Sequence, residues 1–353
     1  MSIDMNTPRV LFICKRRTPN YNNPTYGYGA SYGLLNSCRF LVHALENMGA
    51  WAKVIEVTDN NDIDREVTKY KPTHVYIEAL WVVPSKFDEL IPLHPYVEWN
   101  VRLHSNTPFL ALESIAIEWI KDYAKLQDKY LQFNIAPNSK KMENDLMKSL
   151  GIATEYAPNV YQPYHDPKYA PHFHHGHKDP LSIDIGCFGA IRPLKNHVIQ
   201  AMAAIAFAND LDRTLNFHIN YSRIETSGDN VYKNLVSLFE DSGHNLVTHD
   251  WMDHEKFLKL VSQMDLGLQV SMSETFNIVA ADFAFLNVPI IGSKEIEWMN
   301  ALYQANPTDI DSIIGHLEVA WLGRKVNLQK VNSWGLHKYN EHSRHVWKHH
   351  LGL

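Results

Sequence analysis

Two basic side chains follow a predicted strand in the second half of the chain. The segment GAIRPLKNHVIQA places Arg192 and Lys195 between Gly189, which permits a tight turn, and an apolar helical pattern. Two cations beside the N–H groups and positive dipole end of a helix suit the phosphates of a diphosphate. The alternative is an ordinary solvated helix start with Asn196 as its cap. The segment indicates an anion site, with a plain helix start as the competing interpretation.

Two carboxylates follow a later strand of the same half, in the segment SMSETFNIVAAD. Glu274 and Asp282 are about two helical turns apart, and Asp282 falls in a very apolar helical pattern. An ionised carboxylate only accepts hydrogen bonds, so either acid can bind the hydroxyls of a sugar or a ribose. The backbone N–H groups of Thr275, Phe276 and Asn277 would face the same ligand. A Ser/Glu capping arrangement, with Asp282 as a surface acid, is the structural alternative.

A compact cation cluster lies at the end of the first predicted strand. Lys15, Arg16 and Arg17 are followed by a loop rich in tyrosine and glycine, and glycine lets a backbone approach a ligand closely. Cations and aromatic rings together suit an acceptor that bears phosphate groups and a planar ring. A flexible solvated loop is an equally good interpretation. The loop residues singled out are Gly27, Tyr28 and Gly29.

Polar residues also occupy the end of the fourth predicted strand. Arg102, His104 and Ser105 stand there, and charged groups on a central strand are costly unless they reach a cleft. Arg102 could contact an acceptor phosphate, or it could pair with Glu98 or Glu113. For His104 a structural role and a functional role are equally open.

Two further features carry weaker signals. Trp251 and Met252 follow a strand, and either side chain could stack on a nucleotide base. The favoured alternative is that the aromatic ring closes the edge of the hydrophobic core. The histidines of 166–180 are spaced too tightly for a helical or zinc-finger site, so we predict no metal site there. The chain has no Walker loop, GxSxG elbow, HExxH or CxxC motif.

These candidates need a scaffold of alternating strands and helices. The strand patterns are nearly continuously apolar, which is typical of parallel sheets covered by helices on both faces. Ligands bind at the carboxyl ends of such strands, where the candidates lie. The predicted strands span residues 9–14, 51–57, 73–80, 96–104, 130–137, 153–159, 181–189, 215–222, 245–251, 265–270 and 288–293. The predicted helices span residues 31–49, 139–151, 195–211, 231–243, 254–264 and 277–287.

Length and composition fit two domains. The chain has 353 residues, of which 45% are hydrophobic and 20% charged, so it can form two open-sheet cores. A segment rich in Pro, His and Tyr separates the two halves and indicates a linker. The predicted parts are an N-terminal domain at 1–165, the linker at 166–180, a second domain at 181–328 and a C-terminal helical segment at 329–353.

Charge and cysteine content narrow the class of protein. A net charge of -6, most of it in the second half, argues against coating nucleic acid by bulk charge but leaves a local basic patch open. The three cysteines, Cys14, Cys38 and Cys187, cannot all pair, which is typical of reduced thiols in the cytosol. No apolar run is long enough to span a membrane, and no secretory signal is visible. We therefore expect a cytoplasmic protein without a membrane span.

The segments GxxRPLKNHxxQA and SETFNIVAAD resemble the donor domain of GT-B glycosyltransferases, in particular the retaining nucleotide-sugar enzymes of family four. The resemblance implies two Rossmann-like doubly wound domains that face a cleft, with the C-terminal helix packed back on the N-terminal domain. It implies that Arg192 and Lys195 bind the donor diphosphate and that Glu274 contacts the transferred sugar. Asp282 stands where the family has Glu and would contact the ribose. Specific motifs occur only within about residues 185–300.

The same resemblance assigns further roles. It places the loop of Gly27 and Gly29 near the donor phosphates, the loop of Trp251 at the nucleotide base and His104 at the donor sugar. The N-terminal half contains the segments DNNDID, PTHVYIEALWVVPSKF and VRLHSNTPFLALE, and through them it resembles glycosyltransferases of tailed bacteriophages. That likeness makes a hydroxymethylated pyrimidine in DNA a candidate acceptor, which would be met by Lys15 to Arg17, although the acidic net charge counts against it.

The sequence therefore predicts a retaining, metal-independent glycosyltransferase that needs no cofactor and takes a nucleotide-diphosphate sugar, most simply a UDP-sugar. A polysaccharide, lipid or protein acceptor remains an alternative to DNA. A nucleotide-sugar epimerase of the same fold is a second class, although its carboxylates have no clear match. A non-catalytic nucleotide-binding protein is a third class. The sequence does not determine the sugar or the oligomeric state.

Overall fold

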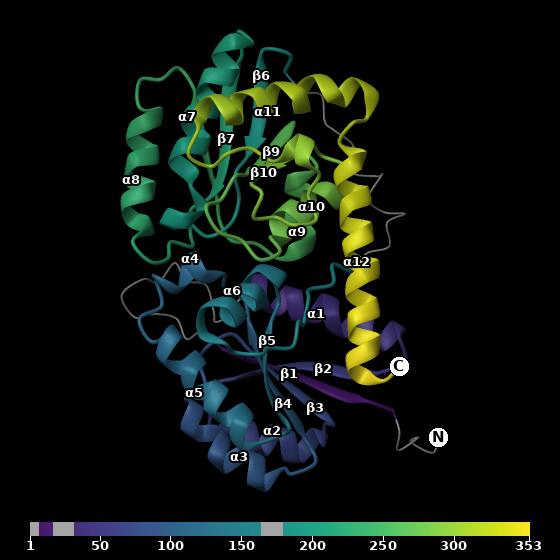
Figure 1. Cartoon of the computed structure of the whole chain (residues 1–353). Helices are drawn as coiled ribbons and strands as arrows, with labels where there is room; N and C mark the ends of the chain where they lie inside the picture. Colours follow the sequence, from purple (N-terminus) through teal and green to yellow (C-terminus); the bar gives the residue numbers. More distant parts are fainter. Residues whose placement is uncertain (1–6, 17–31, 164–178) are drawn as a thin grey trace. The chain divides into compact units, whose positions relative to one another are not determined.

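The computed structural model describes residues 7–16, 32–163 and 179–353, which form two compact units. Unit 1 comprises the chain up to Tyr164 together with Tyr339–Leu353, and unit 2 comprises His165–Lys338. Each unit is a five-stranded parallel sheet with helices packed on it (Figure 1). The predicted fold class, α/β with two Rossmann-like doubly wound domains, is confirmed.

The sheet of unit 1 has the strand order β2-β1-β3-β4-β5, and every paired neighbour is parallel. Strand order reverses beside β1, so the carboxyl ends of β1 and β3 lie at the switch point where such sheets bind ligands. The strands are β1 (Arg9–Lys15), β2 (Trp51–Val57), β3 (His74–Glu78), β4 (Glu98–Leu103) and β5 (Phe133–Pro137).

Alternate residues of β1 face opposite sides of this sheet, as the period of a strand requires. Leu11 and Ile13 pack with α2, α3, α5 and α6, whereas Val10 and Phe12 pack with α1 and the end of α12. Both faces are therefore buried, which explains the continuously apolar strands. The helices are α1 (Tyr32–Asn47), α2 (Asp62–Tyr70), α3 (Phe87–Leu93), α4 (Thr107–Leu110), α5 (Ala116–Lys129), α6 (Lys140–Leu150) and α12 (Lys330–Leu351), with a short 3-10 turn η1 (Pro84–Lys86).

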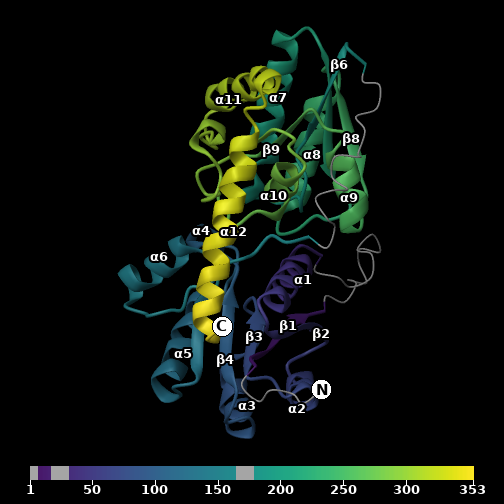
Figure 2. The same cartoon turned by 90° about the vertical axis from the view of Figure 1, so that its right-hand side faces the viewer.

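The last turns of α12 are anchored in unit 1 by Trp347. Its buried ring lies edge-on to Tyr76 at 5.0 Å and to Phe12 at 6.1 Å, and its Nε1 donates to the carbonyl of Pro158 at 2.9 Å. Figure 2 shows this end of α12 alongside the sheet of unit 1. The expected return of the C-terminal helix to the N-terminal domain is therefore observed, although Lys330–Lys338 belongs to unit 2.

The sheet of unit 2 has the order β10-β9-β6-β7-β8, again parallel throughout. Its order reverses beside β6, so the segments after β6 and β9 meet at the carboxyl switch point. The strands are β6 (Ser182–Gly186), β7 (Thr214–Asn220), β8 (Asn245–His249), β9 (Leu266–Gln269) and β10 (Ile290–Gly292).

Aromatic rings contribute to the packing of the helices of unit 2. Phe188, just after β6, contacts Phe257 of α9 and Phe283 of α10, and Phe207 of α7 contacts Trp321 of α11. The helices are α7 (His197–Asp210), α8 (Gly228–Phe239), α9 (His254–Val261), α10 (Ile278–Phe285) and α11 (Ile310–Gly323), with 3-10 turns η3 (Pro193–Lys195), η4 (Ala301–Tyr303) and η5 (Arg324–Val326).

Local signals for element ends succeeded in part. Ser139 caps α6 and Gly151 ends it in a left-handed conformation, as predicted. The predicted strand 153–159 is wrong, because this segment is irregular. Its Ala157 carbonyl accepts a hydrogen bond from the Arg102 side chain. The predicted helix 195–211 begins at His197 instead, because a 3-10 turn precedes it.

Candidate functional site

Lys195 and Glu274 form an ion pair at the carboxyl end of the sheet of unit 2. Lys195 Nζ lies 2.5 Å from Glu274 Oε1, and the two side chains are 12% and 7% exposed. A backbone hydrogen bond from Met272 to the carbonyl of Leu194 holds the two segments together. The sequence motifs after β6 and β9 are therefore brought into direct contact.

The turn before α7 owes its shape to two residues with positive φ. Gly189 has φ +114°, and its N–H donates to Asn220 Oδ1 at 3.0 Å. Asn196 has φ +61°, and its side chain makes no helix cap. Instead, Asn196 Nδ2 donates to the carbonyls of Val270 and Pro307. The predicted capping role of Asn196 is therefore wrong, and the residue fastens the turn of Lys195 to the segment after β9.

Arg192 has an acidic partner of its own. Its Nη1 lies 3.4 Å from Glu225 Oε2, and Arg223 also pairs with Glu225 at 2.6 Å. An isolated bridge between Ile191 and Ile224 places these side chains together. Any anion bound by Arg192 would compete with Glu225 for the guanidinium.

Asn277 shapes the entry to α10. It has φ +62°, its side chain accepts from the N–H of Ala280, and its Nδ2 donates to Gln269 Oε1 at 2.8 Å. Phe276 is buried, and its carbonyl accepts from Trp298 Nε1, while Thr275 is partly exposed. This segment is thus fixed by packing around Glu274.

Asp282 is buried on α10 and contacts a histidine of the neighbouring helix α9. It is only 1% exposed, and its Oδ1 accepts from His254 Nε2 at 2.7 Å. Burial pulls the pKa of His254 down, but Asp282 and Asp253 outweigh it and raise that pKa above its usual range. The structure therefore shows Asp282 as a buried partner of His254 on α9, and its contact with a ribose stays a prediction.

Trp251 and Met252 are both partly exposed after the end of β8. The Arg223 guanidinium lies 4.8 Å over the Trp251 ring, and the Trp251 N–H donates to Ser222 Oγ at 2.7 Å. The ring is thus already stacked on one side by a cation. A base could stack only on the part that Arg223 leaves uncovered.

Arg102 in unit 1 is wholly buried. Its Nη1 lies 3.2 Å from Glu78 Oε2, its Nε donates to the Ala157 carbonyl at 2.9 Å, and its Nη2 donates to Asn159 Oδ1. The predicted contact of Arg102 with an acceptor phosphate is therefore wrong, as is its pairing with Glu98 or Glu113. The guanidinium is a structural counter-ion, because strand register places Glu78 directly beside it.

His104, just after β4, is engaged at both ring nitrogens. Its Nε2 contacts Glu78 Oε2, and its Nδ1 lies 3.1 Å from Asn138 Nδ2. Burial lowers the pKa of His104, and Arg102 adds to this effect, against the opposing pull of Glu78. Burial alone would raise the pKa of Glu78, but Arg102 and His104 hold it below its ordinary value.

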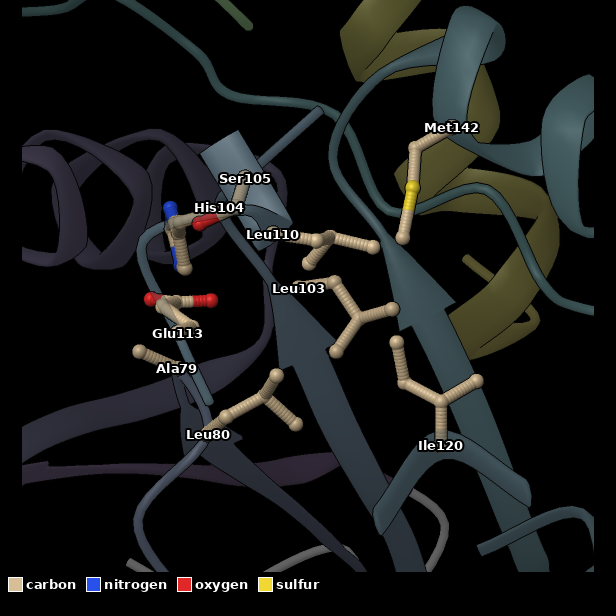
Figure 3. A pocket seen from close by; sticks show the side chains of 9 residues that line it. All are labelled: Ala79, Leu80, Leu103, His104, Ser105, Leu110, Glu113, Ile120 and Met142. Atoms are coloured by element: carbon tan, nitrogen blue, oxygen red, sulfur yellow. The ribbon is translucent and has the colours of Figure 1, made fainter. Parts of the chain in front are cut away.

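His104 and Ser105 line a small pocket at the carboxyl end of β4 (Figure 3). In Figure 3 these two side chains and Glu113 form a polar side, and Leu103, Leu110, Ile120 and Met142 form an apolar side. The cavity measures about 10 Å³, which is room for about one water molecule. It can hold one hydroxyl group but no sugar ring in this conformation.

The cation cluster after β1 is described only in part. Lys15 and Arg16 are exposed, and Lys15 Nζ lies 6.0 Å over the Trp81 ring. The Arg16 N–H donates to the carbonyl of Val57 at 2.7 Å. Four predicted site residues lie outside the described residues, namely Arg17, Gly27, Tyr28 and Gly29.

The described residues show neither a metal-binding cluster nor a membrane-spanning helix. Within residues 7–16, 32–163 and 179–353, no group of three or more His, Cys, Asp or Glu side chains could hold a metal ion. The histidines of the predicted linker 166–180 fall outside that range. Over the same residues, no helix is both long and apolar enough to cross a bilayer.

Sequence reasoning missed the partners of several candidate residues, among them Glu78, Asn138, Glu225 and His254. Glu78 carried a usable signal, since it is a single acid at the end of an apolar strand, on the strand that precedes the one of Arg102. The other three gave no signal, because they lie in segments that bear no motif.

Comparisons with known proteins support the architecture. No family model matches the chain, and no curated protein matches it by sequence. A solved structure of trehalose-6-phosphate synthase is 12% identical, with 98% of this chain and 99% of that chain covered and a TM-score of 0.71.

Two further solved structures show the same likeness. An E. coli structure described as "trehalose-6-phosphate … bound with UDP-2-fluoro glucose" is 11% identical, with 97% and 98% covered and a TM-score of 0.67. A UDP-forming trehalose-phosphate synthase from Burkholderia vietnamiensis is 11% identical, with 98% and 96% covered and a TM-score of 0.62. At this identity the likeness shows the fold alone: the chain has the GT-B architecture of two Rossmann-like domains.

Proposed function

We propose that this protein is a glycosyltransferase that moves a sugar from a nucleotide-diphosphate sugar, a UDP-sugar, to an acceptor hydroxyl. The observation that carries the proposal is the Lys195–Glu274 pair at the carboxyl switch point of unit 2. A cation and a carboxylate in contact supply the two chemistries that such a donor needs, one for phosphate and one for hydroxyls. The solved structures of similar fold support it, since their descriptions name a UDP-sugar analogue and UDP formation.

The main electrostatic task is to stabilise charge on the departing diphosphate. Lys195 and Arg192 would take this role by exchanging Glu274 and Glu225 for phosphate oxygens. Both pairs retain some exposure to solvent. No fully buried charge therefore loses its partner when phosphate replaces the carboxylate. Glu274 would then accept hydrogen bonds from the hydroxyls of the transferred sugar.

We propose retention at the transferred carbon and metal-independent chemistry. The described residues offer the leaving phosphate two cations, so charge neutralisation does not need a divalent ion. Activity should therefore survive EDTA at full strength. Loss of activity on chelation, restored by Mg²⁺ or Mn²⁺, would contradict this part of the proposal.

The exposed Lys15 and Arg16 at the carboxyl end of β1 favour an acceptor that carries negative charge. A sugar phosphate and hydroxymethylated DNA both meet that requirement, whereas a neutral polysaccharide offers these cations hydroxyl groups but no negative charge. The acceptor is therefore proposed as a phosphate-bearing compound with a free hydroxyl.

The direct experiment incubates the protein with UDP-, GDP- and ADP-sugars and a panel of acceptors, followed by mass spectrometry. The panel comprises a hexose phosphate, hydroxymethylcytosine DNA and a neutral oligosaccharide. The expected result is release of UDP with a one-sugar mass gain on an anionic acceptor. An epimerised nucleotide sugar formed without acceptor would instead identify an epimerase, and no turnover of any nucleotide sugar would refute both activities.

A further inference from the structure

His104 is the last member of a chain of contacts that starts at the C-terminal helix. The Trp347 ring lies 5.9 Å from the Arg102 guanidinium, which donates to both carboxylate oxygens of Glu78 at 3.4 and 3.2 Å. Glu78 Oε2 contacts His104 Nε2, and Asn138 Nδ2 lies 3.1 Å from His104 Nδ1. Trp347, Arg102 and Glu78 are all fully buried, so water does not compete for these contacts.

The partners of His104 fix which ring nitrogen carries the proton. Arg102 is always charged, and it keeps Glu78 ionised, so the Glu78 carboxylate can only accept hydrogen bonds. His104 Nε2 must therefore carry the hydrogen. Asn138 Nδ2 can only donate, so His104 Nδ1 must accept. These two requirements together describe one species, the neutral imidazole protonated at Nε2.

We propose that Glu78 is a positioning residue for the transfer reaction: with Arg102 it holds His104 as the neutral Nε2–H tautomer, so that Nδ1 accepts a hydrogen bond from a substrate hydroxyl that replaces Asn138. This inference rests on the proposed glycosyl transfer. The space that His104 lines holds about one water, which matches a single hydroxyl group. His104 then recognises substrate by accepting a hydrogen bond and donates no proton to it.

The charges around His104 favour this assignment. Glu78 at the end of β3 contacts the ring, Glu113 lines the same small pocket, and Arg102 on β4 is the nearby cation. Burial and Arg102 lower the pKa of His104 more than Glu78 raises it. The ring therefore stays neutral at neutral pH, whereas a charged imidazolium would have no acceptor nitrogen.

The test is ¹⁵N NMR of the histidine rings together with steady-state kinetics of the full chain. The variant is Glu78→Gln/Arg102→Met, because removing both charges leaves no uncompensated ion in the core. In the wild type we expect the His104 ring to show the neutral Nε2–H pattern at pH 7 and above. In the variant, the amide introduced at position 78 can donate as well as accept, so the ring should become a mixture of tautomers.

The kinetic readout separates positioning from folding. For the double variant we expect kcat to fall about 10- to 100-fold, with KM for the nucleotide sugar changed less than about threefold. A matched control, Asp265→Asn/Arg324→Met, removes a partly buried ion pair of unit 2 and should change neither the His104 spectrum nor kcat. Circular dichroism melting of both variants checks that they are folded.

The outcomes distinguish this inference from the proposed function. A wild-type His104 protonated at Nδ1, or charged at pH 7, overturns the inference while sugar transfer stands. The inference is also overturned if His104 in the double variant is a mixture of tautomers but kcat is unchanged. If the wild type shows no sugar transfer, the proposed function fails, and the positioning role fails with it even if the tautomer is as expected.

Discussion

The charged side chains at the carboxyl ends of the two sheets are paired in opposite ways. In unit 2, Lys195 and Glu274 form a pair that retains some exposure to solvent. In unit 1, Arg102 and Glu78 form a pair with none. The first pair can exchange partners with a ligand, because water and phosphate can replace each contact as it breaks. The second pair cannot, because each partner would be left as an uncompensated buried charge. We therefore propose that the pair at the carboxyl edge of the sheet serves binding in unit 2 and positioning in unit 1.

The largest effect should come from breaking the buried pair on one side only. Arg102→Met leaves the Glu78 carboxylate buried without its cation, at a cost of about 3–5 kcal/mol in the free energy of unfolding. Urea denaturation measures the change. The control Lys125→Met breaks an exposed pair with Asp122 and should produce no measurable change. A loss below about 1 kcal/mol for Arg102→Met would show that the pair is not a structural requirement.

The next largest effect should come from the Lys195–Glu274 pair of unit 2. Glu274→Gln removes the charge that would orient the sugar, and we expect kcat to fall about 10²-fold or more. UDP affinity should stay unchanged or increase, because Lys195 loses its competing carboxylate. Turnover and UDP titration measure the two quantities, with the exposed Glu255→Gln as control. A Glu274→Gln protein with full turnover would support a non-catalytic role for the site.

A third prediction concerns the stability of the protein at acidic pH. Burial, with Lys195 and Arg192 nearby, lowers the pKa of His197 to about 3, against about 6.5 in an unfolded chain. The unfolded chain then binds more protons below pH 6.5, so stability is complete above that pH and declines as pH falls toward 3. His197 alone should lower the free energy of unfolding by about 2 kcal/mol between pH 8 and pH 5.

Denaturation at pH 8 and pH 5 tests this value. If His197 is the source, the loss of unfolding free energy between pH 8 and pH 5 should shrink by about 2 kcal/mol in His197→Met. It should stay the same in His345→Gln, which changes an exposed histidine. An equal loss in the His197 variant and the wild type would rule out this residue. The buried His254–Asp282 pair acts in the opposite sense, because the raised pKa of His254 makes it stabilising at low pH and less so as pH rises.

The smallest effect should come from the exposed cations of unit 1. Lys15→Ala/Arg16→Ala should raise KM for a phosphate-bearing acceptor about two- to tenfold, and added salt should reduce the difference. Hydrolysis of the donor without acceptor should be unaffected. Kinetics at low and high salt with an anionic and a neutral acceptor measure this. An equal KM increase for the neutral acceptor would show that charge is not the reason.

Sequence could predict that the segments after β6 and β9 of unit 2 lie together, because the signals for this contact are local. Arg192 and Lys195 stand in one short segment and Glu274 in another, and both follow apolar strands that identify a parallel sheet. Alternating apolar strands and helical patterns gave the fold class for the same reason. The ends of elements were harder: the 3-10 turn before α7 depends on Asn196 in a left-handed conformation fastened to Val270, a contact between distant segments.

The partners of Arg102 and Asp282 could not be predicted in this way. The partner of Arg102 is on the neighbouring strand, and only strand register shows that Glu78 lies directly beside it. The partner of Asp282 is on a different helix, and His254 stands in a segment without a motif. A charged residue at a strand end can face a ligand or an internal counter-ion, and only the three-dimensional pairing distinguishes the two.

The most direct test of this division of roles is UDP binding measured by isothermal titration calorimetry on three proteins. These are the wild type, Arg192→Ala/Lys195→Ala in unit 2, and Lys15→Ala/Arg16→Ala in unit 1. We predict that the unit 2 variant loses at least about 10- to 100-fold in UDP affinity, whereas the unit 1 variant binds UDP like the wild type. Unchanged affinity in the unit 2 variant, with loss in the unit 1 variant, would contradict the assignment of donor binding to unit 2.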